Sequence, residues 1–270
     1  MKNLTGKDRL IVALDLPAVD TALELVEDLD NVSFFKVGWE LFIAGMTAGD
    51  IGNLWLALQT RGRQVFIDLK VPPDIQNTIA SLVRSLSDKN VQFLTLNEAM
   101  PIETIRAARA ARGTRGVPKL LMVPYLSSLD GTKDLSLLYG ATDFEGFLRE
   151  RAEAALGAGC DGLIASGETA IRLFRSEFPS AIIVSPGIRP LGASHHDHKR
   201  FTTPTQAIQF GSDYLVVGRP IINDPNPREA ARRIIAEIDS ALAKHEPVSG
   251  GGGAEQDHSG FTYAAKSPIR

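Results

Sequence analysis

One segment of the chain places acid–base residue types at the end of an apolar, strand-like run. The residues from Val65 to Leu69 are rich in β-formers and include Asp68, and Lys70 follows directly. Because side chains on a strand alternate between its two faces, Asp68 and Lys70 should share one face while Leu69 takes the other. In a buried parallel strand this face opens at the carboxyl end, where α/β enzymes keep their chemistry. The spacing predicts a carboxylate and an ammonium held close together, although such a pair taken alone is more often a surface ion pair.

The elements that must position this pair alternate along the chain. Apolar runs that predict strands are separated, in most cases, by amphipathic helical patterns. This order predicts an α/β fold of the (βα)8 TIM barrel type, with the helices in an outer ring and a doubly wound sheet as the alternative. The eight predicted strands are Leu10–Leu14, Phe34–Val37, Gln64–Leu69, Phe93–Leu96, Leu120–Pro124, Gly162–Ala165, Ala181–Ser185 and Tyr214–Val217. The clearest predicted helices are Ala18–Leu29, Ile75–Leu86, Phe144–Leu156 and Arg228–Lys244.

Length and composition fit one globular domain. The chain has 270 residues, and 29 Lys and Arg stand against 32 Asp and Glu, for a formal charge of -3. This balance gives no case for a basic surface that binds nucleic acid or a membrane, so we expect neither partner. The single cysteine, Cys160, cannot form an internal disulfide, and the first residues lack the apolar stretch of a signal peptide or a membrane span. We therefore expect a cytoplasmic protein.

Two segments interrupt the alternation of strands and helices. Pro186–Thr203 is rich in Gly, Pro and polar residues and is long for a barrel loop, so we interpret it as a mobile lid. Residues 246–270 include four consecutive glycines and have the composition of a flexible linker. We therefore predict a barrel domain over residues 1–245 and a disordered tail over residues 246–270.

Short motifs stand at or near six of the predicted strand ends. They are Val12-Ala-Leu-Asp15, Phe35-Lys-Val-Gly38, Asp68-Leu-Lys70 with Asp74-Ile-Gln-Asn-Thr78, Leu126-Ser-Ser128, Pro186-Gly-Ile-Arg189 and Val217-Gly-Arg-Pro-Ile221. In this order they resemble the orotidine 5′-monophosphate decarboxylase family, from about Arg9 to about Lys244. Each motif is weak alone, but the ordered set is specific. The resemblance implies a barrel that converts orotidine 5′-monophosphate to uridine 5′-monophosphate and carbon dioxide in pyrimidine biosynthesis, without a cofactor or a metal.

The resemblance implies catalytic and ribose-binding roles for four charged residues. Asp15 and Lys36 match positions that hold the ribose hydroxyls, and Lys36 also joins the charged network. Asp68 and Lys70 match the catalytic acid and base. Loss of carbon dioxide leaves a carbanion at C6 of the pyrimidine, and a lysine ammonium can both stabilise and protonate it. Asp68 would keep Lys70 charged and positioned and would crowd the departing carboxylate.

Other matching positions bind the substrate away from C6. Ser127 matches a hydroxyl that contacts the pyrimidine edge, while Arg189, Gly218 and Arg219 match phosphate-site positions. In the family, the lid usually carries an Asp-Gln pair whose glutamine contacts the phosphate. This chain has His198 in place of that glutamine. A histidine can still donate a hydrogen bond to phosphate, so we expect His198 to take this role.

The resemblance also implies a second subunit at the site. Asp74, with Ile75 and Thr78 beside it, matches the part that family members insert into the neighbouring subunit's site. We therefore expect a homodimer with shared active sites. Between Lys70 and Asp74 this chain has Val71-Pro72-Pro73, one residue more than the family usually has, and the two prolines stiffen the turn.

Simpler explanations stand beside these roles. Lys36 could extend its ammonium to solvent from a strand end, and Asp15 could cap the following helix. Gly218 could begin a plain turn, and Ser127 could be an ordinary loop hydroxyl. A further departure from the family is Asn97-Glu98-Ala99-Met100 after the fourth strand, where a histidine followed by small residues is common.

Three other patterns suggest no additional chemistry. The cluster from His195 to His198 lacks the spacing of a zinc site, so we expect no metal there. Gly157-Ala-Gly159 follows a helical run and precedes a strand, which is the order of a helix C-cap and not of a dinucleotide motif. Cys160 has no activating neighbour in the sequence and is expected to pack in the core.

Two alternative functions remain open. The first is a metal-dependent sugar-phosphate decarboxylase or aldolase on the same barrel, against which the lysine–aspartate network and Ser127 argue. The second is a phosphate-binding barrel without catalysis, which the additional proline before Asp74 would allow.

Overall fold

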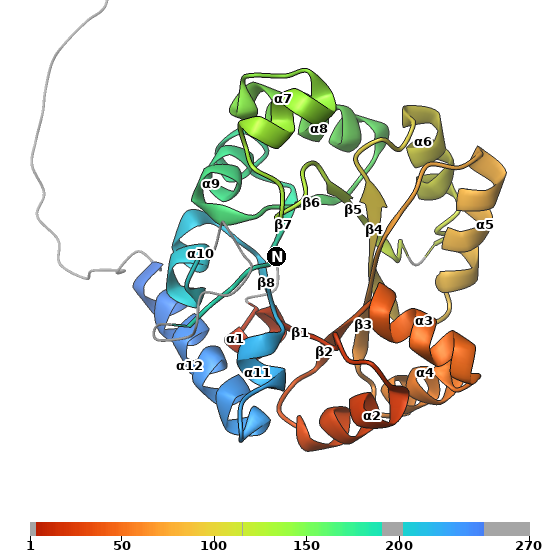
Figure 1. Ribbon diagram of the computed structural model, residues 1–270, viewed down its shortest axis with the longest axis vertical. Helices are drawn as coiled ribbons and strands as arrows, with labels where there is room; N and C mark the ends of the chain where they lie inside the picture. The colour runs from red at the N-terminus through yellow and green to blue at the C-terminus, as the bar shows by residue number, and fades with distance from the viewer. Residues whose placement is uncertain (1–3, 115, 191–201, 246–270) are drawn as a thin grey trace, which may run out of the picture.

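The predicted strands form a closed parallel barrel. The computed structural model describes residues 4–114, 116–190 and 202–245. Each strand pairs with the next in sequence, and the last pairs with the first, inside a ring of helices (Figure 1). The TIM barrel is therefore confirmed, and the doubly wound alternative is wrong because the sheet closes on itself. The strands are β1 (Leu10–Ala13), β2 (Phe34–Gly38), β3 (Gln64–Val71), β4 (Val91–Asn97), β5 (Lys119–Val123), β6 (Gly162–Ile164), β7 (Ile182–Ser185) and β8 (Tyr214–Val217).

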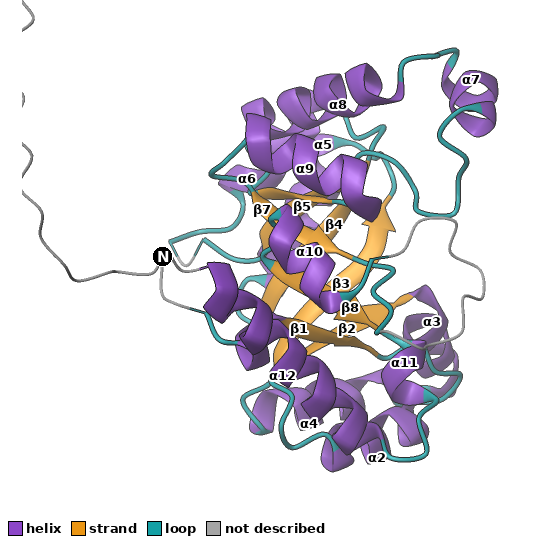
Figure 2. Cartoon of the chain, turned by 90° about the vertical axis from the view of Figure 1, so that its left-hand side faces the viewer, coloured by secondary structure: helices purple, strands orange, loops and turns teal. Residues whose placement is uncertain are grey.

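The helices cover the outside of the barrel (Figure 2). The four helices predicted from periodicity are present as α2, α5, α8 and α12, with ends within two residues of the prediction. The predicted C-cap is confirmed, since Gly159 ends α8 with a left-handed φ of 112°. The helices are α1 (Gly6–Arg9), α2 (Val19–Asp28), α3 (Trp39–Ala48), α4 (Ile51–Thr60), α5 (Gln76–Leu86), α6 (Ile102–Ala110), α7 (Lys133–Tyr139), α8 (Phe144–Ala158), α9 (Gly167–Glu177), α10 (Pro204–Phe210), α11 (Arg219–Ile222) and α12 (Pro227–His245).

Strand alternation divides the apolar core into two layers. Outward side chains, such as Phe35 and Val65, belong to the layer between the sheet and the helices. Inward side chains fill the barrel itself, and Phe34 and Phe66 pack against Phe93 with ring centroids 5.2 and 5.7 Å apart. Since packed side chains close the interior, a substrate site must lie beyond them, at the carboxyl ends of the strands. The inner layer consists of Ile11, Ala13, Phe34, Phe66, Phe93, Leu121, Val184 and Val216.

The predicted lid and tail lie largely outside the described residues. The lid, Pro186–Thr203, is described only at its two ends. There, Ile188 and Thr202 form an isolated parallel bridge, and the backbone N–H of Arg189 donates to the carbonyl of Thr202 at 2.9 Å. The two ends of the segment are thus tied together. Residues 246–270 are not described, so the domain boundary after residue 245 stays a prediction.

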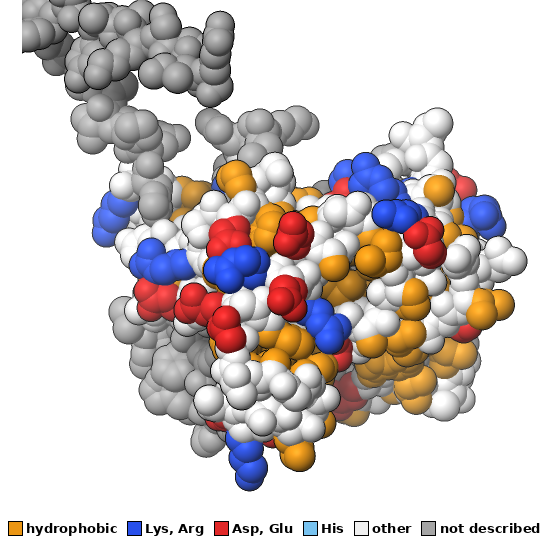
Figure 3. Space-filling model, turned by 90° about the horizontal axis from the view of Figure 1, so that it is seen from above, with side chains coloured by type: hydrophobic (Ala, Val, Ile, Leu, Met, Phe, Trp, Pro, Cys, Tyr) orange, Lys and Arg blue, Asp and Glu red, His pale blue; other side chains and the backbone are white. Residues whose placement is uncertain are grey.

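One face of the molecule mixes charges of both signs, in keeping with the nearly balanced composition. On the face shown in Figure 3, Lys and Arg side chains lie among Asp and Glu side chains and do not gather by sign. Within the described ranges, no single helix is long and apolar enough to cross a membrane. Only α3 and α4 taken together, across a 115° bend, reach that length and composition.

Candidate active site

The carboxyl ends of the strands surround a pocket that collects most of the predicted site residues. Its volume is about 320 Å³, within the range of small-molecule sites. Inner-layer side chains, among them Ala13, Phe66 and Val216, form its apolar floor. The predicted residues that line it are Asp15, Lys36, Asp68, Lys70, Ser127, Arg189, Gly218 and Arg219.

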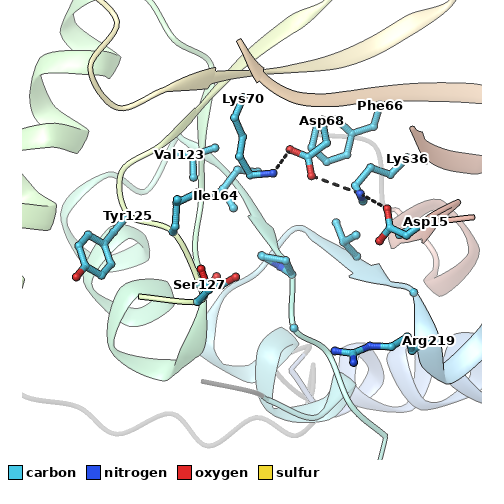
Figure 4. Close-up of a pocket in the computed structure, with 18 of the residues that line it drawn as sticks. Asp15, Lys36, Phe66, Asp68, Lys70, Val123, Tyr125, Ser127, Ile164 and Arg219 are labelled. Atoms are coloured by element: carbon cyan, nitrogen blue, oxygen red, sulfur yellow. Dashed lines mark hydrogen bonds and ion pairs between the residues drawn. The ribbon is translucent and has the colours of Figure 1, made fainter. Parts of the chain in front are cut away.

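Four charged side chains form a continuous network along one wall of this pocket (Figure 4). Lys36 Nζ lies 2.8 Å from Asp15 Oδ1 and 3.5 Å from Asp68 Oδ2. Lys70 Nζ lies 2.9 Å from Asp68 Oδ1. The predicted contact between Asp68 and Lys70 is therefore confirmed. Along the network the charges alternate in sign, so that each carboxylate lies between or beside ammonium groups.

Burial and neighbouring charges act in opposite directions on the two central groups. Burial by itself raises the pKa of Asp68, but Lys36 and Lys70, with hydrogen bonds from Lys70 and Thr95, outweigh it and hold that pKa below its ordinary value. Burial by itself lowers the pKa of Lys36, but Asp68 and Asp15 outweigh it and raise that pKa above its ordinary value. Both groups are therefore ionised at neutral pH, although Lys36 is buried and the Asp68 side chain is only 15% exposed.

The backbone departs from regular strand geometry at Lys70. Its φ of 43° lies in the left-handed region, which residues with a Cβ rarely adopt. Pairing of β3 with β4 passes from Ile67–Leu94 directly to Val71–Leu96, so β3 bulges over this interval. Leu69 packs outward as predicted. Asp68 and Lys70 meet as expected, but a bulge with a left-handed residue brings them together, and simple alternation does not.

Thr95 on β4 belongs to the site, although the sequence pattern did not single it out. Its side chain is fully buried. Its Oγ1 donates to Asp68 Oδ1 at 3.0 Å and accepts from the backbone N–H of Lys70 at 2.8 Å. The available signal was a hydroxyl within the apolar run Phe93–Leu96, beside the strand that carries Asp68. A buried hydroxyl in such a strand needs partners, and these are its partners.

Two simpler explanations from the sequence are wrong. Asp15 does not cap the next helix, because α2 has Ala18 at its N-cap, and the Asp15 carboxylate accepts from Lys36 instead. Lys36 does not extend to solvent, since only 8% of its surface is exposed. Gly38 explains how these two groups meet, because a Cβ there would lie 3.2 Å from both Asp15 Oδ1 and Lys36 Nζ.

The other side of the pocket carries the residues expected near phosphate and base. Figure 4 shows Ser127 and Arg219 across the pocket from Lys70. Arg219 begins α11, and Gly218 occupies the N-cap of that short helix. Arg189 is buried, and its guanidinium donates to the Ile188 carbonyl at 3.0 Å. The ends of β7 and β8 thus bring cationic groups to one region, as barrels that bind phosphate do.

The remaining predicted residues lie elsewhere. Asp74, Ile75 and Thr78 are exposed and do not line the pocket of their own chain. Asp74 Oδ1 accepts from the Ile75 backbone N–H at 2.6 Å, and both residues line a separate surface groove with Pro101. His198 lies outside the described residues.

The described residues offer no further cluster for metal or thiol chemistry. No group of three or more His, Cys, Asp or Glu side chains among them is arranged to hold a metal ion. The cluster from His195 to His198 falls outside this part of the chain. Cys160 is buried, and burial, with a smaller effect of Asp161, raises its pKa to about 12. Its predicted role in packing is confirmed.

Comparison with known proteins gives consistent matches over most of the chain. The family model described as "Orotidine 5'-phosphate decarboxylase / HUMPS family" matches residues 8–234. Two relatives named orotidine 5′-phosphate decarboxylase, from Rhodopseudomonas palustris strains BisB5 and HaA2, are 43% and 44% identical, each over 87% of this chain and 96% of the relative. The crystal structure of orotidine 5′-phosphate decarboxylase from Lactobacillus acidophilus superposes with a TM-score of 0.70 at 29% identity, over 86% of this chain and 100% of that one.

Proposed function

This chain belongs to the orotidine 5′-phosphate decarboxylase / HUMPS family, and from that premise we propose that it converts orotidine 5′-monophosphate to uridine 5′-monophosphate and carbon dioxide in pyrimidine biosynthesis. The protein is accordingly a carboxy-lyase. The observation that carries the proposal is the alternating network of Asp15, Lys36, Asp68 and Lys70 at the barrel mouth. We place the reaction in the cytoplasm, as the sequence led us to expect.

In the proposed reaction, Lys70 both stabilises charge and supplies the proton. The bond between C6 and the carboxyl carbon breaks, its electron pair stays on C6, and carbon dioxide leaves. The Lys70 ammonium faces this charge and then transfers a proton to C6, after which its neutral amine takes a proton from water. The Lys70 side chain is 36% exposed and the Asp68 side chain 15%, and both line the pocket, so both can approach a substrate.

Asp68 has two roles in the proposal. It holds Lys70 Nζ at 2.9 Å, and its lowered pKa keeps it anionic when a second carboxylate, that of the substrate, arrives. The resulting repulsion ends when carbon dioxide departs, so it favours the transition state over the ground state. Lys36 also forms an ion pair with Asp68, which lowers the electrostatic free energy needed to keep Asp68 ionised beside a second carboxylate.

The substrate would lie across the pocket, with C6 of its base facing the charged network and its phosphate at the opposite side. Asp15 is half exposed and can accept from a ribose hydroxyl, and Ser127 can contact the pyrimidine edge. The ends of β7 and β8 would hold the phosphate, and its binding energy would align C6 with the charged network. The proposed substrate-binding residues are Asp15, Lys36, Ser127, Arg189, His198, Gly218 and Arg219, with Ile75 and Thr78 from a partner subunit.

We further propose that the active form is a homodimer joined mouth to mouth. Asp74 and its neighbours are exposed and lie outside the pocket of their own chain, where a second copy could receive them. On the same side of the barrel (Figure 1), α3 exposes Trp39, Ile43 and Met46 by 49%, 47% and 57%, and Ile75 is 69% exposed. Apolar side chains gathered beside a site are typical of an interface.

Loss of the orotate absorbance, followed with pure protein in the presence of a chelator, tests the reaction. We expect turnover that the chelator does not reduce, and a loss of at least about a thousandfold in kcat for Lys70→Ala with binding of uridine 5′-monophosphate retained. Turnover that requires added metal would favour the sugar-phosphate enzymes, and nucleotide binding without turnover would favour a non-catalytic barrel.

Subunit mixing tests the shared site. Lys70→Ala and Asp74→Ala proteins should each be nearly inactive, but a mixed dimer has one site with both changes and one with neither. Random exchange at equal amounts makes about half of the dimers mixed, so about a quarter of wild-type activity per site should return. The matched control mixes Lys70→Ala with Asp68→Asn, where every site keeps one change and no activity should return. If both mixtures stay inactive although subunits exchange, Asp74 acts within its own chain.

A further inference from the structure

The peptide group that joins Leu69 to Lys70 is hydrogen-bonded at both ends by side chains. The carbonyl of Leu69 accepts from Trp39 Nε1 at 2.8 Å. The N–H of Lys70 donates to Thr95 Oγ1, also at 2.8 Å. Because the carbonyl and the N–H of one trans peptide point in opposite directions, the two side chains hold this peptide plane from opposite sides. They come from different elements, α3 and β4.

The orientation of this plane decides where the Lys70 side chain points. Rotation of the plane changes φ of Lys70, which here has the disfavoured value of 43°. Pairing with β4 skips from Ile67 to Val71, so this ladder does not restrain the peptide between them. A left-handed residue persists only where its surroundings fix it, and the two side-chain hydrogen bonds are positioned to do so.

We propose that Trp39 and Thr95 are positioning residues that clamp this peptide and so aim the Lys70 ammonium at the reacting carbon. The inference rests on the function proposed for Lys70. Thr95 also donates to Asp68 Oδ1 at 3.0 Å, so its one hydroxyl joins the backbone of Lys70 to the carboxylate that Lys70 contacts. Among the described residues, Trp39 donates to the Leu69 carbonyl and to none of the four charged groups, so it acts on the peptide.

Trp39 and Thr95 differ in burial, so we expect their replacement to lower kcat by different factors. Thr95 is fully buried, so water cannot replace its hydroxyl. The Trp39 side chain is about half exposed, and its ring lies edge-on to Phe42 with centroids 6.2 Å apart. Thr95 also contacts Asp68, so its replacement breaks two hydrogen bonds at the site where loss of the indole breaks one. We therefore expect a larger effect from Thr95 than from Trp39.

Steady-state kinetics of Trp39→Phe, Thr95→Val and Thr95→Ser test the clamp. We expect kcat to fall about fivefold for Trp39→Phe and at least about tenfold for Thr95→Val, while KM changes less than about twofold, because Lys70 acts in the transition state. Thr95→Ser retains the hydroxyl and should restore most of the rate. Trp39→Phe is the cleaner test, since it leaves both the aromatic ring and the hydrogen bond to Asp68 in place.

Crystal structures of the same variants provide a second measurement that does not depend on activity. Released from the clamp, Lys70 should move to a negative φ, and its Nζ should leave Asp68. If the wild-type protein fails to decarboxylate the nucleotide, the proposed function fails, but these structures still decide the clamp. The clamp is overturned if Lys70 keeps its left-handed φ in both variants. It is also overturned if Trp39→Phe loses activity only as its dimers dissociate, which light scattering at the assay concentration would show.

Discussion

Replacement of Lys36 by methionine should destabilise the protein in a pH-dependent way. Methionine is similar in length to lysine and keeps the apolar packing of the lysine methylene groups, so the change removes mainly the charge. Lys36 lies 3.5 Å from the buried carboxylate of Asp68 and 2.8 Å from the half-exposed carboxylate of Asp15. The variant therefore leaves Asp68 with Lys70 as the one cation in contact among the described residues.

The expected loss of unfolding free energy depends more on the burial of the ion pair than on the distance between its charges. At an effective dielectric of about 20, a pair at this separation attracts by about 5 kcal/mol, but desolvation of both ions offsets much of it. Breaking a buried pair by removal of one partner costs about 3–5 kcal/mol. Lys70 still contacts Asp68, and solvent screens the contact with Asp15. We therefore expect Lys36→Met to lower the free energy of unfolding by about 3 kcal/mol at pH 7.

The sign of the pH dependence follows from the pKa of Asp68. In the wild-type protein this pKa lies below 3.8, so the stabilisation is present above that pH and is lost as pH falls through the folded-state value. Without Lys36, a smaller positive charge counteracts the effect of burial on Asp68, so the pKa of Asp68 rises. The variant therefore loses less stability on acidification than the wild-type protein does. The difference in unfolding free energy between the two proteins should therefore stay nearly constant down to the ordinary carboxyl pKa of 3.8 and shrink as pH falls below it.

Urea unfolding followed by circular dichroism, at fixed protein concentration and several pH values, measures this difference. Glu27→Gln is the matched control, because it breaks a surface pair with Arg61 whose side chains are 63% and 37% exposed. That change should alter stability by less than about 1 kcal/mol at every pH. An unchanged stability of Lys36→Met, or the same deficit at about pH 3 as at pH 7, would refute the electrostatic account.

Three further predictions address other parts of the molecule. Arg219→Ala should raise KM for orotidine 5′-monophosphate by about ten- to a hundredfold and leave any activity on the unphosphorylated nucleoside unchanged, as kinetics with both substrates would show. Gly38→Ala should lower kcat/KM, because the new Cβ would lie 3.2 Å from Asp15 Oδ1 and Lys36 Nζ, whereas the equally small change Gly52→Ala meets nothing within 4 Å and should be neutral in the same assay. Native Cys160, with its pKa raised to about 12, should react with iodoacetamide at pH 8 on the order of a thousandfold more slowly than in the urea-unfolded chain, as mass spectrometry would measure.

The sequence alone determined the barrel and most of one wall of the site. Apolar runs of strand length, separated by amphipathic helices, left few ways to bury both faces of a sheet, and the closed barrel is one of them. Alternation of side chains along a strand places Phe34 and Lys36, and likewise Phe66 and Asp68, on inward faces. Once the strands close, these charged residues must meet at the carboxyl end. The site residues that follow from local pattern are therefore those at regular strand positions.

Only the tertiary structure decided the geometry at Lys70 and the partners that fix it. Beside the left-handed Lys70, the Leu69 carbonyl accepts from Trp39 and the Lys70 N–H donates to Thr95, and these partners lie 30 and 25 residues away in the sequence. No periodicity records such contacts, because they form only after α3 and β4 have packed around β3. The resemblance led us to expect Asp74 in a partner's site, and the fold accordingly leaves it outside the pocket of its own chain. The local sequence pattern determines the helices and strands, and contacts between distant elements determine the backbone angles at Lys70 on which the proposed chemistry depends.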